Sequence, residues 1–349
     1  MLPLLPPLRP KLSAALRDVT SRDERARAAA AEALGSAPPE RADEARAALR
    51  PLLDDPSASV RCAALSSLGH LRDGASLDVI LARFEDGDPT VRQVAMIAAG
   101  DIGDARAVDA LARGLRRKQP EVRFQAVASL ARILGEEAVA RLEDLVEDPD
   151  AEVRAHLAEA LGSIEAPAAV PPLRRLHDDA ERRVREAAAI GLARCGDEAG
   201  ADTLVSLLTD RDRCFEAAWA LGELRVARAA DPLARLAGAL FAPLAVKAAA
   251  AAALVRLADP RGEPALARVL RALRSDARGY AAQLVGELRL ASLAPDVAKL
   301  ADRPRGADPM VVAEALGKLA EVSDEAARAL ARMAERDDAV GERARELAR

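Results

Sequence analysis

Apolar positions recur along the chain in blocks of about 31 residues. Val60, Val91, Val122, Val153 and Val184 stand 31 residues apart, each is followed by Arg, and an apolar residue comes eight positions after each Val. Self-similarity at a period of 20–50 residues is typical of solenoid proteins. The apolar position continues over the whole chain, with spacings of 29 to 34 residues, at Leu34, Leu68, Ala99, Leu130, Leu161, Leu192, Leu221, Leu254, Val285, Leu316 and Leu347.

Each block predicts a pair of helices. The segment after each Val reads approximately Val-Arg-x-x-Ala-x-x-Ala-Leu-Gly-x-Leu, in which apolar residues recur at helical spacing and one stripe is buried. An Asp, often followed by Pro, precedes this second helix and can begin it. A first helix of the next block follows, for example over residues 104–115 or 196–208. Six glycines near the end of the second helix serve as C-terminal caps or permit close packing: Gly69, Gly100, Gly162, Gly222, Gly286 and Gly317.

Neither helix of such a pair can bury its apolar face alone, so neighbouring pairs must stack. We therefore predict an all-α fold, an α-solenoid of about eleven helical hairpins that fills residues 1–349 as a single array. Residues 1–35 and 324–349 are charged and Ala-rich, and we expect them to cap its ends. The pattern is least regular over residues 197–258, where Cys214 replaces the Arg and residues 236–243 form an apolar insertion. A local change of curvature is expected there.

Composition narrows the class of protein. Hydrophobic residues make up 50% of the chain but aromatic residues only 2%, so small aliphatic side chains must form the core of thin helix pairs. The net charge of -5 comes from mixed acidic and basic residues, which indicates a solvated surface. Cys62, Cys195 and Cys214 lack metal-ligand spacing, which favours inert thiols in a reducing compartment. The apolar residues 1–8 are broken by prolines and are expected to lead into the first helix, and no run is long enough for a membrane span. We expect a soluble, cytoplasmic protein.

This arrangement of turn, second helix and helix-end glycine resembles the HEAT-repeat family, in particular the short bacterial HEAT-like repeats also found in phycobilin lyase subunits. The resemblance covers essentially the whole chain. It implies a right-handed superhelix whose second helices line the concave side. It also implies a ladder of turn Asp and second-helix Arg residues that links adjacent turns. Matching positions are Asp88 with Arg92 and Asp148 with Arg154. The match is weaker at Arg61, Arg123 and Arg185, and it is lost at Cys214.

The third, sixth and tenth positions after each Val lie along one helix face that the core does not require. Four of the six aromatic residues lie on or beside this face, next to several glutamates. Exposed aromatic side chains beside charges are typical anchors of protein-recognition surfaces. We predict a non-enzymatic scaffold or adaptor that binds a protein partner along the concave face, with a basic or helical segment as the candidate partner. The predicted contact residues are Phe124, Gln125, His156, Glu159, Phe215, Glu216, Trp219, Glu223, Tyr280, Gln283 and Glu287. In the alternative interpretation, Phe124 and Phe215 only fill space between repeats.

Other functions have weaker support in the sequence. Glutamates beside aromatic residues could act as general acids or bases, but no nucleophile, phosphate loop or set of metal ligands accompanies them. His70, His156 and His177 share no metal spacing, so we expect no cofactor or metal. A chromophore-handling lyase is implied only by the resemblance. Nucleic-acid binding is disfavoured, because a basic row at the tenth position is interrupted by acidic residues. That row consists of Arg132, Arg194, Arg256 and Lys318, and Asp101, Glu223 and Glu287 interrupt it.

Overall fold

The computed structural model describes residues 12–302 and 306–348, and over these ranges it contains helices and turns but no strand. The predicted lead-in at residues 1–8 lies outside the described residues. Each of the eleven predicted apolar positions lies in a second helix, so the predicted repeat is confirmed. The second helices are α2 (Glu24–Leu34), α4 (Ala58–His70), α6 (Pro89–Ile102), α8 (Pro120–Leu134), α10 (Ala151–Ile164), α12 (Arg182–Arg194), α14 (Cys214–Glu223), α16 (Leu244–Arg256), α18 (Ser275–Glu287), α20 (Pro309–Ala320) and α22 (Ala339–Leu347).

The first helices are shorter, and many begin with a 3-10 turn. The predicted segments 104–115 and 196–208, for instance, contain the 3-10 turns Ala105–Ala107 and Glu198–Gly200 before their α-helices. Asp104 and Asp197 cap these turns through their side chains. The first helices are α1 (Leu12–Asp18), α3 (Ala42–Leu49), α5 (Leu77–Ala82), α7 (Val108–Gly114), α9 (Ala138–Leu142), α11 (Val170–His177), α13 (Ala201–Leu207), α15 (Ala230–Gly238), α17 (Gly262–Leu270), α19 (Ala294–Ala301) and α21 (Asp324–Ala334).

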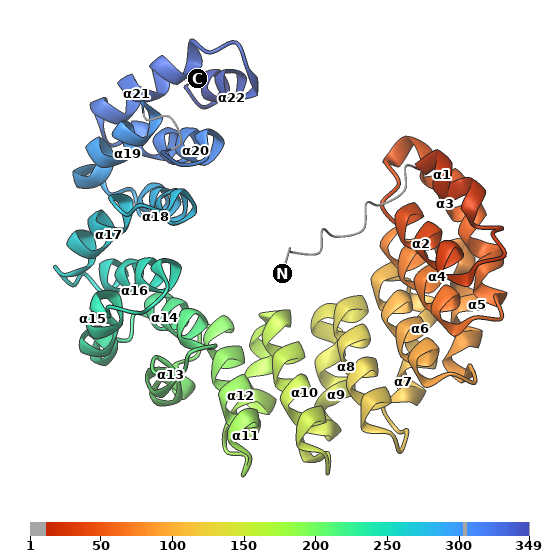
Figure 1. Ribbon diagram of the computed structural model, residues 1–349. Helices are drawn as coiled ribbons and strands as arrows, with labels where there is room; N and C mark the ends of the chain where they lie inside the picture. The colour runs from red at the N-terminus through yellow and green to blue at the C-terminus, as the bar shows by residue number, and fades with distance from the viewer. Residues whose placement is uncertain (1–11, 303–305, 349) are drawn as a thin grey trace. The chain divides into compact units, whose positions relative to one another are not determined.

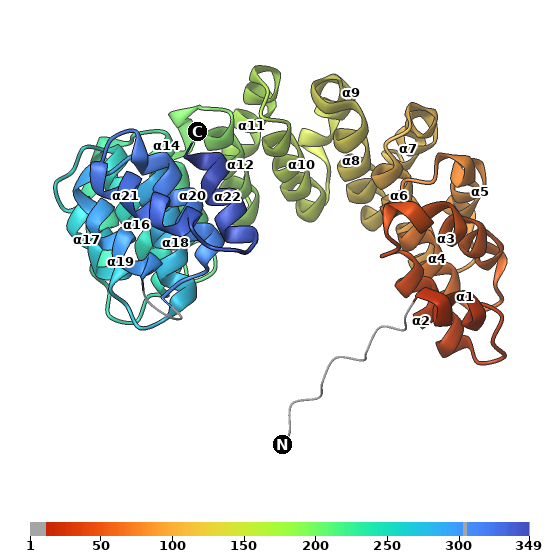
Figure 2. The ribbon, with the colours of Figure 1, turned by 90° about the horizontal axis from the view of Figure 1, so that it is seen from above.

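The chain divides into two compact units, residues 1–188 and 189–349, and the boundary falls within α12. Within each unit, successive second helices pack side by side, as α4 does on α6 and α14 does on α16 (Figures 1 and 2). This stacking of hairpins defines an all-α solenoid. That residues 1–349 form one array with capping units at 1–35 and 324–349 stays a prediction.

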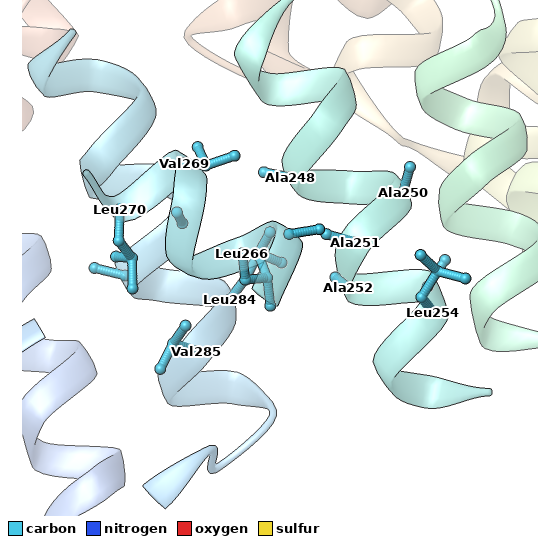
Figure 3. Close-up of a cluster of buried hydrophobic side chains, with 14 of the residues drawn as sticks. Ala248, Ala250, Ala251, Ala252, Leu254, Leu266, Val269, Leu270, Leu284 and Val285 are labelled. Atoms are coloured by element: carbon cyan, nitrogen blue, oxygen red, sulfur yellow. The ribbon is translucent and has the colours of Figure 1, made fainter. Parts of the chain in front are cut away.

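Small aliphatic side chains form the core, as the composition predicts. Figure 3 shows buried side chains of α16, α17 and α18 that belong to the core of unit 2, among them Leu254, Leu266 and Leu284. Helix α16 is the extreme case, because every residue from Ala248 to Leu254 is fully buried. It packs against α14, α15, α17 and α18, and alanines on all its sides permit this close packing.

Helix-end glycines allow second helices to approach one another closely. A Cβ atom at Gly222 of α14 would lie 2.8 Å from the Cα of Ala253 in α16, and one at Gly286 would lie 2.9 Å from the Cα of Ala315. The close-packing alternative is therefore confirmed at these positions. The left-handed backbone conformation that ends a second helix occurs a few residues later, at Gly103 and Gly196, and also at non-glycine residues such as Glu165 and Ala258.

In unit 1 the second-helix Arg residues form the expected ladder, but each Arg pairs with the turn of the following repeat. The Nε and Nη2 atoms donate to an Asp carboxylate at 2.6–3.1 Å. The Nη1 atom donates to a backbone carbonyl of the Arg residue's own turn. We call these pairs the Arg–Asp ladder: Arg27–Asp55, Arg61–Asp86, Arg123–Asp148 and Arg154–Asp179.

This geometry corrects the predicted pairs. Asp148 accepts from Arg123 of the preceding repeat, and Arg154 reaches forward to Asp179. The pair of Asp88 with Arg92 was wrong, because the Asp88 side chain instead caps α6 by accepting from the amides of Thr90 and Val91. Arg61 and Arg123, for which the sequence match is weaker, are full members of the Arg–Asp ladder.

The corresponding Arg position changes along unit 2. Cys214 occupies it in α14, and Lys247 occupies it in α16, where its Nζ donates to the Leu240 carbonyl at 3.4 Å. Arg278 of α18 donates to the carbonyls of Ala272 and Gly306. The insertion at residues 236–243 forms the end of α15 and an exposed loop, in which Phe241 is 98% exposed.

Candidate functional site

The predicted contact residues of unit 2 lie on α14 and α18, two second helices that have α16 between them. The rings of Phe215 on α14 and Tyr280 on α18 lie 6.1 Å apart, centroid to centroid. The Arg256 Cζ of α16 lies 4.4 Å from the centroid of the Trp219 ring, within the range of a cation–π interaction. Arg256 Nη2 also pairs with Glu223 Oε1 at 3.0 Å. We call Phe215, Trp219, Glu223, Arg256 and Tyr280 the aromatic–arginine cluster.

Small side chains on α16 bring this cluster together. Helices α14 and α18 both pack on α16, so rings that extend from them can meet only if α16 presents little between them. At the third and sixth positions after Val246, α16 carries Ala249 and Ala252, and both are fully buried. We infer that Phe215 and Tyr280 meet above these alanines.

Arg256 is the positively charged residue of the cluster and contacts both Trp219 and Glu223. Its side chain is 15% exposed, and its Nη1 atom is buried without a hydrogen-bond acceptor in the described part of the chain. A buried donor without an acceptor costs about 1–3 kcal/mol. The pKa of the Tyr280 hydroxyl is raised, chiefly by burial and further by the Glu287 carboxylate, although the Arg256 charge opposes this shift. The hydroxyl is therefore protonated and able to donate at neutral pH.

The remaining predicted residues of unit 2 surround the cluster. Glu216 accepts from Arg194 Nη2 at 2.6 Å, and Glu287 accepts from the Gln283 amide at 2.9 Å. With Glu223 paired to Arg256, two of the three glutamates already have a cation beside them. The surface is therefore less acidic than the sequence suggests.

A second group lies in unit 1. The rings of Phe124 on α8 and His156 on α10 stack with centroids 4.7 Å apart and planes at 29°. His156 Nδ1 lies 3.0 Å from Glu159 Oε2. The two helices border a cleft of about 520 Å³, whose lining includes His156 and Glu159. Phe124 is half-buried, and both its role as a contact residue and the space-filling alternative stay predictions.

Gln125 does not belong to an accessible surface, and its selection as a contact residue was wrong. Only 8% of its surface is exposed. Helix α8 packs between α6 and α10, and this position is buried at that packing. Two of the acidic residues that interrupt the tenth-position basic row in the sequence also pair with its arginines in the structure. Arg132 pairs with Asp101, Arg194 with Glu216 and Arg256 with Glu223, which lowers the positive potential that this row offers to phosphates.

Over 12–302 and 306–348, no group of three or more His, Cys, Asp or Glu side chains could hold a metal ion. Burial raises the pKa of the Cys62 and Cys214 thiols, which disfavours the reactive thiolate. Among the same residues, no helix is long and apolar enough to span a membrane.

Paired helices stacked into a solenoid, with recognition-type side chains on the second helices, define a helical-repeat scaffold. Comparison with models of protein families identifies which family of helical-repeat proteins this is. Models of HEAT repeats match residues 9–89, 77–155 and 143–214, and a model of the PBS lyase HEAT-like repeat matches residues 214–238. The chain therefore belongs to the HEAT-repeat family. A search of the curated proteins found no match.

Solved structures with a similar fold share limited sequence identity. One is a chain of the complex of CpcE and CpcF of phycocyanin lyase from Nostoc sp. PCC7120, at 23% identity over 63% of this chain and 92% of that one, with a TM-score of 0.45. An engineered protein is 21% identical over 97% of both chains, with a TM-score of 0.40. Kap121p is 15% identical over 96% of this chain and 45% of its own, with a TM-score of 0.44. These similarities concern the fold and not the activity.

Proposed function

We propose that the protein is a non-enzymatic scaffold that binds a partner protein at the aromatic–arginine cluster of unit 2. The observation that carries this proposal is the grouping of one exposed ring, two half-buried rings and an arginine on neighbouring second helices. Phe215 is 40% exposed, and Trp219 and Tyr280 are half-buried beside it. Trp, Tyr and Arg are the residue types most often found at the energetic centres of protein interfaces.

The cluster indicates the chemistry of the bound segment. Covering the exposed part of the Phe215 ring would contribute about 2 kcal/mol, at roughly 25 cal/mol per Å² of apolar surface. The Arg256 guanidinium, whose side chain is 15% exposed, would donate to a carbonyl oxygen of the bound segment, and a peptide offers one at every residue. The bound segment therefore combines an apolar side chain with an accessible backbone carbonyl, as the end of a helix does. Because Glu216 and Glu223 are already paired with arginines, the bound segment does not need to be strongly basic.

Photocrosslinking tests this site on the full chain. We would place p-benzoyl-phenylalanine at Phe215 and, as a matched control, at Val79 of α5, which is 43% exposed on a first helix. In cells that naturally make the protein, the proposal predicts a discrete crosslinked protein from position 215 and not from position 79. Equal crosslinking from both positions would argue against the site.

Binding measurements with the crosslinked protein complete the test. Phe215→Ser should weaken binding at least tenfold, whereas Val79→Ser should leave it unchanged. Both variants should change the melting temperature by similar small amounts, because the two residues are exposed to a similar extent, 40% and 43%. Arg256→Lys keeps a positive charge but removes the planar donor and should also weaken binding. Unchanged affinity in both Phe215→Ser and Arg256→Lys would contradict the proposal.

A further inference from the structure

One step of the Arg–Asp ladder in unit 1 has no aspartate. Arg92 of α6 holds the same helix position as Arg61 and Arg123, and its Nη1 donates to the carbonyls of Asp86 and Gly87 as theirs do to their own turns. The residue 25 positions further, where Arg61 and Arg123 find Asp86 and Asp148, is here Arg117. Arg117 pairs instead with Glu85.

The Nε and Nη2 atoms of Arg92 therefore have no acceptor among the described residues. In the four complete steps, this edge of the guanidinium holds a carboxylate through two parallel hydrogen bonds. Such bidentate pairs are the strongest arginine–carboxylate arrangement. The carbonyl bonds to Nη1 already fix the plane of the Arg92 guanidinium, so its free edge is preorganised.

Arg92 lines a pocket of about 330 Å³. Arg92, Arg113, Arg117 and Gln119 line it with polar groups, and Met96 and Val122 contribute apolar surface. Glu85 and Asp86 also border it, but Glu85 is paired with Arg117 and Asp86 with Arg61. Arg92 and Arg113 remain as cations without an acidic partner in the described chain, so the pocket has a positive excess.

We propose that this pocket binds a carboxylate ligand. The carboxylate takes the place of the missing ladder aspartate on Nε and Nη2 of Arg92, and Arg113 attracts a second negative group. A carboxylate is favoured over phosphate because the same arginine edge selects a carboxylate in four neighbouring steps. The proposal is independent of the partner site in unit 2.

NMR of arginine side chains tests the proposal on the full chain. Sodium succinate would be titrated at constant ionic strength, with chloride as the replaced anion, while the Nε–H signals of Arg92 and Arg154 are followed. The Arg92 signal should shift and saturate at millimolar succinate, whereas Arg154 should not respond because Asp179 occupies its edge. Parallel shifts of both signals, or no saturable shift at Arg92, would overturn the proposal.

Two variants distinguish binding of succinate at Arg92 from a general effect of the positive charge. Arg117→Asp supplies the missing ladder carboxylate within the chain. It should shift the Arg92 Nε–H signal without succinate and reduce the response to succinate at least tenfold. Arg92→Lys keeps the charge without the planar edge, so succinate should no longer raise its melting temperature. If Arg92→Lys responds as the wild type does, the proposal fails.

Two further probes define the ligand. Inorganic phosphate should bind at least tenfold more weakly than succinate, and tighter binding of phosphate would refute the carboxylate assignment. An N-acetylated, C-amidated tripeptide with a central Asp presents one carboxylate on a peptide. Tighter binding of this peptide than of succinate supports an acidic protein segment as the source of the carboxylate, whereas tighter binding of succinate supports a small dicarboxylate.

Discussion

Units 1 and 2 share one repeat but hold it together differently. In unit 1, four Arg–Asp pairs connect one repeat to the next. The recurring apolar positions of the second helices keep a constant spacing of 31 residues from Leu68 to Leu161. In unit 2, the Arg position is Cys214 in α14 and Lys247 in α16, and the spacing changes to 29 and then 33. Close contacts of glycine with a neighbouring second helix occur in both units, at Gly69 in unit 1 and at Gly222 in unit 2, but at α14 and α16 no ladder pair accompanies them.

The difference shows what each kind of contact demands. A bidentate ion pair requires fixed positions for two planar groups, so an insertion in one repeat would break it. Contacts between small apolar side chains tolerate changes in loop length as long as the helices still meet. We infer that the Arg–Asp ladder preserves register in unit 1, and that its absence at α14 and α16 left room for the insertion and for the aromatic–arginine cluster.

The largest expected effect comes from breaking the most buried step of the ladder. Arg123→Met should lower the free energy of unfolding of unit 1 by about 3–5 kcal/mol, because it leaves the Asp148 carboxylate buried without its cation. Hydrogen exchange read by mass spectrometry over residues 12–188 measures the loss. Protection in unit 2 serves as the internal control.

A double variant tests whether the lost stability comes from the unpaired buried charge. Arg123→Met combined with Asp148→Leu should recover most of the lost stability, because no charge stays buried. If the single variant costs less than about 1 kcal/mol, the ladder contributes little and the comparison between the units is unfounded.

The next effect depends on pH. The Asp179 pKa is lowered, first by hydrogen bonding to Arg154, so its stabilising contribution is present above the unfolded pKa of about 3.9 and is lost as the pH falls through the folded value. Asp179→Asn should cost about 2 kcal/mol at pH 7, in the range for hydrogen bonds to charged groups. This difference from the wild type should shrink below pH 4 in urea titrations. A difference that stays constant down to pH 3 would exclude an ionic origin.

The packing of unit 2 is tested at Gly222. Gly222→Ala should destabilise unit 2 by about 1–3 kcal/mol, because the new Cβ would lie 2.8 Å from Ala253 and force α14 and α16 apart. Gly279→Ala is the matched control on α18, since its Cβ would meet the nearest atom at 3.9 Å. That variant should be stabilised by about 0.5–1 kcal/mol through helix propensity. Similar changes in melting temperature for both variants would contradict the close-packing argument.

The sequence predicted the second helices well because every repeat imposes the same helical spacing on its apolar residues. The sequence could not show which aspartate pairs with each arginine of the Arg–Asp ladder. Turns carry two acidic residues two positions apart, such as Asp86 and Asp88, and only one of them reaches an arginine. The approach of Phe215 to Tyr280 depends on how α14 and α18 pack on α16 between them, which no local pattern reveals. Burial of Gln125 likewise depends on how α8 packs between its neighbours.

The smallest effect concerns the residue that ends each second helix. Ala258 in unit 2 has φ of +56°, a left-handed conformation that costs a residue with a Cβ about 1–2 kcal/mol. Ala258→Gly removes this strain but makes the unfolded chain more flexible, so we expect a net gain of about 0.5–1 kcal/mol. Gly196→Ala is the reverse change at the equivalent position, where φ is +75° and a Cβ would meet no atom within 4 Å. Because space is not limiting at Gly196, a loss of similar size measured by urea unfolding would be due to backbone conformation alone. Changes of the same sign in both variants would show that packing, and not the left-handed backbone, governs the helix end.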